Sequence, residues 1–241
     1  MKTRIPSTPL KVKVFADGAE KAKMLELYNN PLVAGFTTNP TLMRQAGVKD
    51  YEAFAKDVLL TITDRPISFE VFSDDFEDMQ RQALKIAGWG SNVYVKIPIT
   101  NTRGESAAPL IRSLVDRGVK LNVTAIFSLP QIDSTVAALK GTPHSYVSVF
   151  AGRIADAGID PIPYIKYAVV ACEAARGMEV IWASPREVLN VVQADNVGCH
   201  IITITPDLLK KISGLGKDLD VFSLETVKMF YSDGEAAGFK L

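Results

Sequence analysis

The feature that most constrains the fold is an alternation that recurs along nearly the whole chain. A short apolar run is followed by a polar or glycine-containing turn, and then by a longer stretch with helical periodicity. Short apolar runs of this kind are typical of parallel strands that are buried on both faces. The eight predicted strands are residues 11–17, 34–39, 67–73, 92–100, 120–128, 146–153, 179–184 and 200–205.

The segments between these runs place apolar residues at three- and four-residue steps, as a helix with one buried face requires. The predicted helices are residues 50–60, 74–88, 107–118, 129–139, 161–176, 185–194 and 207–212. Eight strands that alternate with helices predict an α/β fold, a single (β/α)8 TIM barrel. The competing architecture is an open doubly wound sheet. The count of eight, and a first strand with no glycine-rich dinucleotide turn after it, favour the barrel.

Residues 1–241 show no linker, low-complexity segment or break in composition, which predicts one barrel domain. From about residue 219 the pattern predicts an extra C-terminal helix, over 223–233, and then an arm. This tail carries Phe222, Leu224, Phe230, Tyr231 and Phe239, and is too apolar to stay exposed. We therefore expect the tail either to close the barrel or to pack on a neighbouring subunit.

Charge and hydropathy argue against several classes of protein. Lys and Arg number 27, as do Asp and Glu, so the net charge of +0 gives no reason to expect nucleic-acid or membrane binding. No apolar run approaches the roughly 20 residues that span a bilayer, and no signal peptide is visible. Cys172 and Cys199 do not make a disulfide framework. One disulfide stays open as an alternative, but a reducing cytoplasm is the simpler interpretation, and we expect a soluble, cytoplasmic protein.

One lysine, Lys96, stands in the middle of the apolar run Val-Tyr-Val-Lys-Ile-Pro-Ile-Thr at residues 93–100. A lysine in such a strand has two common explanations. Its stem can lie along apolar surface while its head reaches water at the strand end. Alternatively, burial keeps the amine uncharged, and the amine is then a nucleophile that can form a Schiff base with a carbonyl.

Polar side chains mark the carboxyl ends of the other predicted strands, where (β/α)8 barrels carry their chemistry. They are Asp17, Thr37, Thr38, Asn39, Glu70, Asn122, Thr124, Ser148, Arg153, Ser184, Arg186, Thr203 and Thr205. Taken singly, each has a structural explanation. Asp17 would cap the next helix, Glu70 would be a structural ion-pair partner of the lysine, and Ser184 before a proline would be an N-cap. Arginines most often lie on the surface, and threonines suit strands by propensity.

Taken together, these groups predict one cooperative site. Burying so many polar groups without mutual hydrogen bonds would cost about 1–3 kcal/mol each. A site in which they bind one another and a substrate is the simpler explanation. His144 and His200 have no partner ligands at useful spacing, so we expect no metal site.

Four segments resemble the motifs of transaldolases, including the short subfamily that also contains fructose-6-phosphate aldolases. They are Ala-Gly-Phe-Thr-Thr-Asn-Pro-Thr-Leu at 34–42, Val-Tyr-Val-Lys-Ile-Pro at 93–98, Leu-Asn-Val-Thr-Ala-Ile-Phe at 121–127 and Phe-Ala-Gly-Arg-Ile at 150–154. The likeness runs in order from Phe15 to about Phe230. It implies a (β/α)8 barrel of class I aldolase type that needs no cofactor.

The resemblance also implies a role for each strand-end residue. Lys96 matches the Schiff-base lysine, Asp17 matches the acid/base carboxylate, and Glu70 with Thr124 match the pair that holds a catalytic water. The implied substrate-binding residues are Thr37, Asn39, Asn122, Ser148, Phe150, Arg153, Ser184 and Arg186. Asn39 and Asn122 match residues that bind substrate hydroxyls, and Ser148 matches a residue near the ketose C1 hydroxyl. Arg153, Ser184 and Arg186 match a phosphate site. Phenylalanine at position 150 matches the transaldolase branch, because the aldolase branch has a tyrosine there that helps activate water.

The implied activity is transfer of a dihydroxyacetone unit from a ketose phosphate, fructose 6-phosphate or sedoheptulose 7-phosphate, to an aldose phosphate. The implied place is the transaldolase step of the pentose phosphate pathway, with a specialised biosynthetic role as the open alternative. The alternatives are a fructose-6-phosphate aldolase on the same scaffold, a non-catalytic sugar-phosphate binding protein that kept the pocket, and a scaffold subunit whose apolar tail drives assembly. Relatives form dimers, pentameric rings or decamers, so we expect a homo-oligomer.

Overall fold

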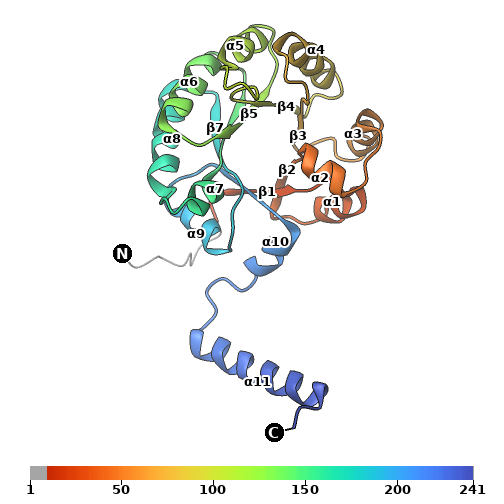
Figure 1. The fold of residues 1–241 in the computed structure, drawn as a ribbon, viewed down its shortest axis with the longest axis vertical. Helices are drawn as coiled ribbons and strands as arrows, with labels where there is room; N and C mark the ends of the chain where they lie inside the picture. Colours follow the sequence, from red (N-terminus) through yellow and green to blue (C-terminus); the bar gives the residue numbers. More distant parts are fainter. Residues whose placement is uncertain (1–9, 241) are drawn as a thin grey trace.

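The strands of this protein close into a barrel. The structure, a computed structural model, describes residues 10–240. Eight parallel strands pair in chain order, and the last returns to the first (Figure 1). They are β1 (Lys13–Asp17), β2 (Val33–Thr37), β3 (Ile67–Glu70), β4 (Val93–Pro98), β5 (Leu121–Ile126), β6 (Ser145–Val149), β7 (Met178–Trp182) and β8 (Ile201–Ile204). The predicted (β/α)8 barrel is therefore confirmed, and the open doubly wound sheet is wrong.

Helices fill the connections and form a ring outside the strands (Figure 1). They are α1 (Lys21–Tyr28), α2 (Pro40–Gln45), α3 (Tyr51–Leu59), α4 (Phe76–Ala87), α5 (Ala108–Asp116), α6 (Leu129–Leu139), α7 (Ala151–Asp156), α8 (Ile162–Ala175), α9 (Leu189–Asn196), α10 (Pro206–Ile212) and α11 (Leu219–Ala237). Several begin at a side chain that accepts a hydrogen bond from the first turn, as Asn39, Asp50, Asp75 and Ser128 do. Local sequence thus sets where these helices start.

Some boundaries differ from the sequence predictions. The predicted strand 146–153 ends at Val149, and Arg153 lies in α7. The predicted helix 185–194 begins only at Leu189. The predicted tail helix 223–233 is longer at both ends. It begins four residues earlier, where Asp218 accepts bonds from the first turn, and it ends at Ala237, before a left-handed Gly238. The sequence pattern does not predict α1 or α2, since each is short and buries a single methionine.

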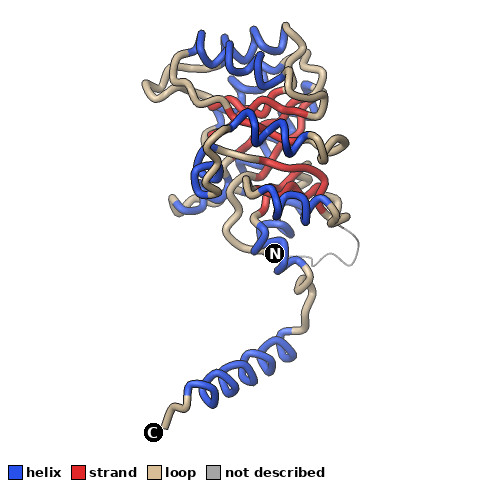
Figure 2. The backbone as a smooth tube through the Cα atoms, turned by 90° about the vertical axis from the view of Figure 1, so that its right-hand side faces the viewer, coloured by secondary structure: helices blue, strands red, loops and turns tan. Residues whose placement is uncertain are grey.

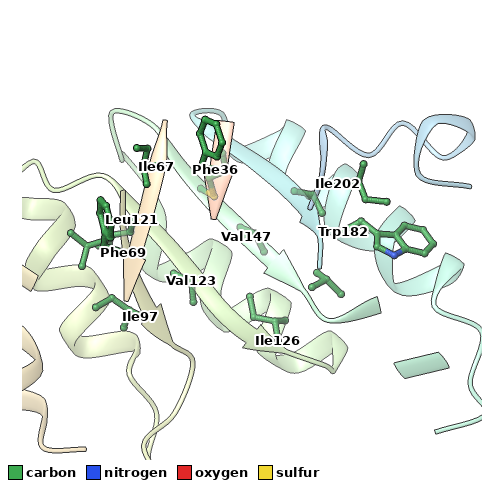
Figure 3. Packing of buried hydrophobic residues seen from close by; sticks show 14 of the residues in the cluster. Phe36, Ile67, Phe69, Ile97, Leu121, Val123, Ile126, Val147, Trp182 and Ile202 are labelled. Carbon is green, nitrogen blue, oxygen red and sulfur yellow. The ribbon is translucent and has the colours of Figure 1, made fainter. Parts of the chain in front are cut away.

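Side chains alternate between the barrel interior and the ring of helices along each strand. The outward-facing ones pack beneath the helices and make the larger apolar core, which includes Phe36, Ile67, Phe69, Ile97, Leu121, Val123, Ile126, Val147, Trp182 and Ile202 (Figure 3). Cys172 and Cys199 are also buried, and both are free thiols. The residues between the outward positions are thereby left to face the interior.

The barrel interior contains an aromatic floor made by Phe15, Tyr94 and Tyr146. The ring centroids of Tyr94 and Tyr146 are stacked at 4.2 Å, and Phe15 meets Tyr146 edge-on at 5.7 Å. Two positions further along the same strands stand Asp17, Lys96 and Ser148. Because the side-chain period of a strand is two, these polar groups form the next interior layer, toward the carboxyl ends.

Helix α11 lies apart from the barrel. After α10 the chain leaves the ring, and α11 projects away from it (Figures 1 and 2). None of its residues is buried, and Phe222, Phe230 and Tyr231 are among its exposed side chains. The expectation that the tail closes the barrel is therefore wrong, whereas packing on a neighbouring subunit stays a prediction. No helix within residues 10–240 has the length and apolar character needed to cross a membrane.

Candidate active site

The carboxyl ends of the strands surround a cavity of about 450 Å³. Its lining includes nearly all of the predicted site residues: Asp17, Thr37, Asn39, Glu70, Lys96, Asn122, Thr124, Ser148, Phe150, Arg153 and Ser184. Thr203 lines it too, whereas Arg186, Thr38 and Thr205 do not. The Thr38 hydroxyl donates to the Ser68 carbonyl oxygen, and Thr205 caps α10 by accepting from the Leu208 N–H. A second cavity of about 250 Å³ lies beside it, between α1 and α2, and is mostly apolar. The polar cavity is the candidate active site, since the polar strand-end groups converge there.

Lys96 points into the barrel because it shares register with two other inward residues. Its Cα pairs with those of Glu70 on β3 and Asn122 on β5. The Lys96 Nζ lies 3.3 Å from Glu70 Oε2 and donates to the carbonyl oxygen of Thr38, also at 3.3 Å. The lysine side chain is only 9% exposed. The alternative of a strand-end lysine with its head in bulk water is therefore wrong.

Asp17 is the second carboxylate of the cavity. It pairs in register with Thr37, whose hydroxyl donates to Asp17 Oδ1 at 3.0 Å. Burial raises the pKa of Asp17, and the positive charge of Lys96 opposes that shift. Asp17 does not cap the next helix, because α1 begins after Glu20. A carboxyl that keeps its proton to higher pH than usual suits a group that must both accept and return one.

Asn122 and Ser148 form a buried hydrogen-bonded row across the floor of the cavity. The Ser148 hydroxyl donates to Asn122 Oδ1 at 2.6 Å, and Asn122 Nδ2 donates to Ser68 Oγ at 2.9 Å. Ser68 is a site-supporting residue that the sequence analysis missed. The signal was available, because Ser68 stands two positions before Glu70 and so faces the same side of β3. These bonds fix the amide of Asn122 in one orientation.

Thr124 reaches the cavity beside a distortion of β5. The register between β5 and β6 shifts between Val123 and Ile126, and Ala125 has a φ of 59°, in the left-handed region. The Thr124 hydroxyl is buried and has no hydrogen-bond partner within residues 10–240. Buried hydroxyls nearly always have a partner, so this one is suited to bind a water or substrate group in the cavity.

One end of the cavity is basic. Arg153, on α7, lines it and lies over the Phe150 ring at 5.6 Å. Ser184 also lines it but has a φ of 59°, so the predicted N-cap before α9 is wrong. Arg186 instead binds Asp156, with its Nε donating to Asp156 Oδ1 at 3.0 Å. The sequence gives no sign of this pair, since the partners are thirty residues apart.

A family model described as "Transaldolase/Fructose-6-phosphate aldolase" matches residues 14–240. The chain belongs to this transaldolase/fructose-6-phosphate aldolase family. The predicted family is thereby confirmed, and with it a transaldolase-like enzyme. The motif residues quoted from the sequence all fall within the matched range, and the family's class I aldolase barrel agrees with the fold.

Individual members of the transaldolase/fructose-6-phosphate aldolase family are similar over most of their length. A "Probable transaldolase" of Methanococcus maripaludis is 36% identical over 203 residues, 83% of this chain and 89% of its own length. A "Probable transaldolase 2" of Listeria monocytogenes is 34% identical over 223 residues, 88% of this chain and 98% of its own.

The solved 3-keto-L-gulonate-6-phosphate decarboxylase of Vibrio cholerae has a TM-score of 0.54 at 10% identity, over 81% of this chain and 88% of that one. That last likeness concerns the fold alone.

Proposed function

We propose that this protein is a transaldolase that transfers a dihydroxyacetone unit between sugar phosphates through a Schiff base on Lys96. The observation that carries the proposal is the placement of Lys96, nearly buried in a polar cavity and 3.3 Å from Glu70. A buried amine beside a carboxylate in a substrate-sized cavity is suited to attack a carbonyl, because the carboxylate can take and return the protons of the reaction.

The first half-reaction breaks the ketose. The neutral amine of Lys96 adds to the C2 carbonyl, and loss of water, assisted by Glu70 and Thr124, gives an iminium. Its positive nitrogen accepts the electron pair of the C3–C4 bond while Asp17 removes the proton of the C4 hydroxyl. An aldehyde leaves, and a three-carbon enamine stays on the lysine.

The second half-reaction builds the new ketose. The enamine carbon attacks the carbonyl carbon of an acceptor aldehyde, and Asp17 returns its proton to the alkoxide that forms. Water then adds to the iminium, which releases the product and restores the amine of Lys96. Group transfer results when the acceptor arrives before water protonates and hydrolyses the enamine.

An anionic chain end would anchor both sugars at the basic end of the cavity. Arg153 and Ser184 line that end, and a guanidinium binds phosphate oxygens bidentately. Arg186 is paired with Asp156 through its Nε and one Nη in this structure, and we propose that it joins them when the anion binds. Fructose 6-phosphate or sedoheptulose 7-phosphate as donor, with an aldose phosphate as acceptor, matches this arrangement. The proposal places the enzyme in the cytoplasm, which its two free thiols favour, and in the pentose phosphate pathway.

A panel of donors and acceptors tests this proposal against its alternatives. We expect product only when a ketose phosphate and an aldose phosphate are both present. Release of free dihydroxyacetone from fructose 6-phosphate without an acceptor would identify an aldolase. Tight binding of the sugar phosphates with no turnover of any pair would identify a binding protein.

Phe150 is expected to control the balance between transfer and cleavage. Its ring lines the cavity and has no group that could activate water, so the enamine survives until an acceptor arrives. We expect Phe150→Tyr to raise acceptor-independent cleavage of fructose 6-phosphate about tenfold or more. Phe127→Tyr is the control, because its ring packs on Phe150 at 5.5 Å but does not line the cavity. Loss of transfer in Phe150→Tyr with no gain of cleavage would contradict this role.

The proposal includes a homo-oligomer assembled through α11. A helix of 19 residues that buries none of them and exposes Phe222, Phe230 and Tyr231 needs an external partner. We expect light scattering to give a mass of several chains for the intact protein and of one chain for a variant that ends at Lys217. Both should still form the Lys96 adduct with a donor. A monomeric intact protein would contradict assembly through α11.

A further inference from the structure

Glu70 sits where the barrel sheet begins to open. The ladder between β2 and β3 contains the pairs Phe36↔Ile67 and Thr37↔Ser68, and one further bond joins the Thr38 N–H to the Ser68 carbonyl. Beyond that point the chain turns away into α2. In a parallel strand, backbone groups of alternate residues face the same neighbour, so the N–H and C=O of Glu70 face the missing end of β2.

The hydroxyl of Tyr51 fills this gap. It accepts a hydrogen bond from the Glu70 N–H at 2.8 Å and donates to the Glu70 carbonyl oxygen at 3.1 Å. One side chain thus satisfies both backbone groups that β2 leaves unpaired. Tyr51 is the first residue of α3, and the helix start is fixed by Asp50, whose carboxylate accepts from the Ala53 N–H.

Neighbouring aromatic rings hold the phenol in place. Phe69 and Phe72 meet the Tyr51 ring nearly perpendicularly, at centroid distances of 6.1 Å and 4.6 Å, and Trp89 packs at 5.7 Å. These contacts fix the position of the ring, so the hydroxyl is held beside the Glu70 backbone on β3. Burial raises the pKa of the phenol, which therefore stays a neutral donor and acceptor.

We propose that Tyr51 is a positioning residue, which holds the end of β3 so that the Glu70 carboxylate stays at Lys96. This inference rests on the proposed function, in which Glu70 assists the loss of water at the Schiff base. Glu70 is the last residue of β3, and without the phenol nothing in residues 10–240 pairs its backbone on the β2 side. A small displacement of the carboxylate would slow the chemistry more than it would weaken sugar binding, because the sugar is held mainly by other strands.

The test is Tyr51→Phe, which keeps the ring and its packing and removes only the hydroxyl. We expect kcat to fall about 10- to 100-fold, with KM changed less than about threefold. The rate at which the Lys96 adduct forms in a single turnover, measured by borohydride trapping, should fall by the same factor. Tyr167→Phe is the matched control, since it removes a hydroxyl that binds Asp133 on the exterior at 2.7 Å, and it should leave both rates unchanged. An unchanged kcat in folded Tyr51→Phe would overturn the proposal.

A double-mutant cycle distinguishes positioning of Glu70 from a general loss of structure. If Tyr51 acts through Glu70, Tyr51→Phe should slow a Glu70→Gln enzyme by less than about twofold. Equal losses in both backgrounds would show that Tyr51 acts elsewhere.

Hydrogen exchange of the intact protein gives a readout that needs no variant and no activity. In the wild-type protein, the Glu70 amide should exchange as slowly as amides of the β3–β4 ladder. This measurement tests the proposal even if the Tyr51→Phe variant does not fold. Fast exchange at Glu70 would overturn the proposal. A wild-type protein that forms no adduct at Lys96 would instead refute the proposed function, while slow exchange at Glu70 would still support the backbone clamp.

Discussion

Replacing Lys96 with alanine should reduce transfer activity by about 10⁴- to 10⁶-fold, the loss that follows removal of a covalent nucleophile. Lys96 is the one lysine among the residues that line the cavity, so no other amine can take its place. With a ketose phosphate and borohydride, the wild-type protein should gain the mass of a reduced three-carbon or whole-sugar adduct on the peptide that contains Lys96. The Lys96→Ala protein should gain none.

Lys13→Ala is the control for this experiment. Lys13 begins β1 at the opposite end of the barrel and forms a half-exposed ion pair with Glu179. Its loss should change activity less than about twofold, because Lys13 does not line the cavity that holds Lys96. Circular dichroism and thermal unfolding would show that each variant folds. An adduct on another lysine, or activity retained in folded Lys96→Ala, would refute the proposed function.

Gly152→Ala should have the largest effect on stability and on the basic end of the cavity. A Cβ at this position would lie 1.5 Å from the Ser184 carbonyl oxygen and 2.6 Å from its carbonyl carbon. No rotamer can relieve this clash, because both sides of the contact are backbone, so α7 and the segment after β7 must separate. We expect a loss of about 3 kcal/mol or more, and a fall in Tm of about 6–12 °C.

The same separation would pull Arg153 away from Ser184. The KM for a phosphorylated donor should therefore rise more than the KM for an unphosphorylated one, which makes no use of the anion site. Gly88→Ala is the matched control, because Gly88 has an ordinary φ of −76° and its Cβ would lie in ordinary contact with Lys85 O at 3.4 Å and Leu84 O at 3.8 Å. A Gly152→Ala protein with unchanged Tm and unchanged KM values would show that the two segments do not need this contact.

Much of the site could be predicted because its residues follow the periodicity of the strands. Glu70, Lys96 and Asn122 each stand between outward-facing apolar residues, so the alternation alone places them in the interior. Parallel register then sets them side by side. Both properties are local or follow directly from the fold class, which the count of eight strands indicates.

The remaining features depend on contacts between distant segments, which no local pattern records. The left-handed φ of Ser184 accompanies its packing on Gly152, and Arg186, in the loop between β7 and α9, pairs with Asp156 at the end of α7. The role of Tyr51 depends on where β2 stops relative to β3, whereas the sequence shows only an apolar position at the start of a helix. Such features become visible only when the whole barrel is assembled.

The aromatic floor has a consequence for the order of events. Because Phe15, Tyr94 and Tyr146 fill the barrel axis directly beneath Lys96, sugars cannot pass through the barrel. In the proposed reaction, donor, departing aldehyde and acceptor would therefore all use the mouth above the carboxyl ends, one after another. With the three-carbon unit held on Lys96, the first product would have to leave before the second substrate enters, so we expect ping-pong kinetics in which each aldehyde competes with the other.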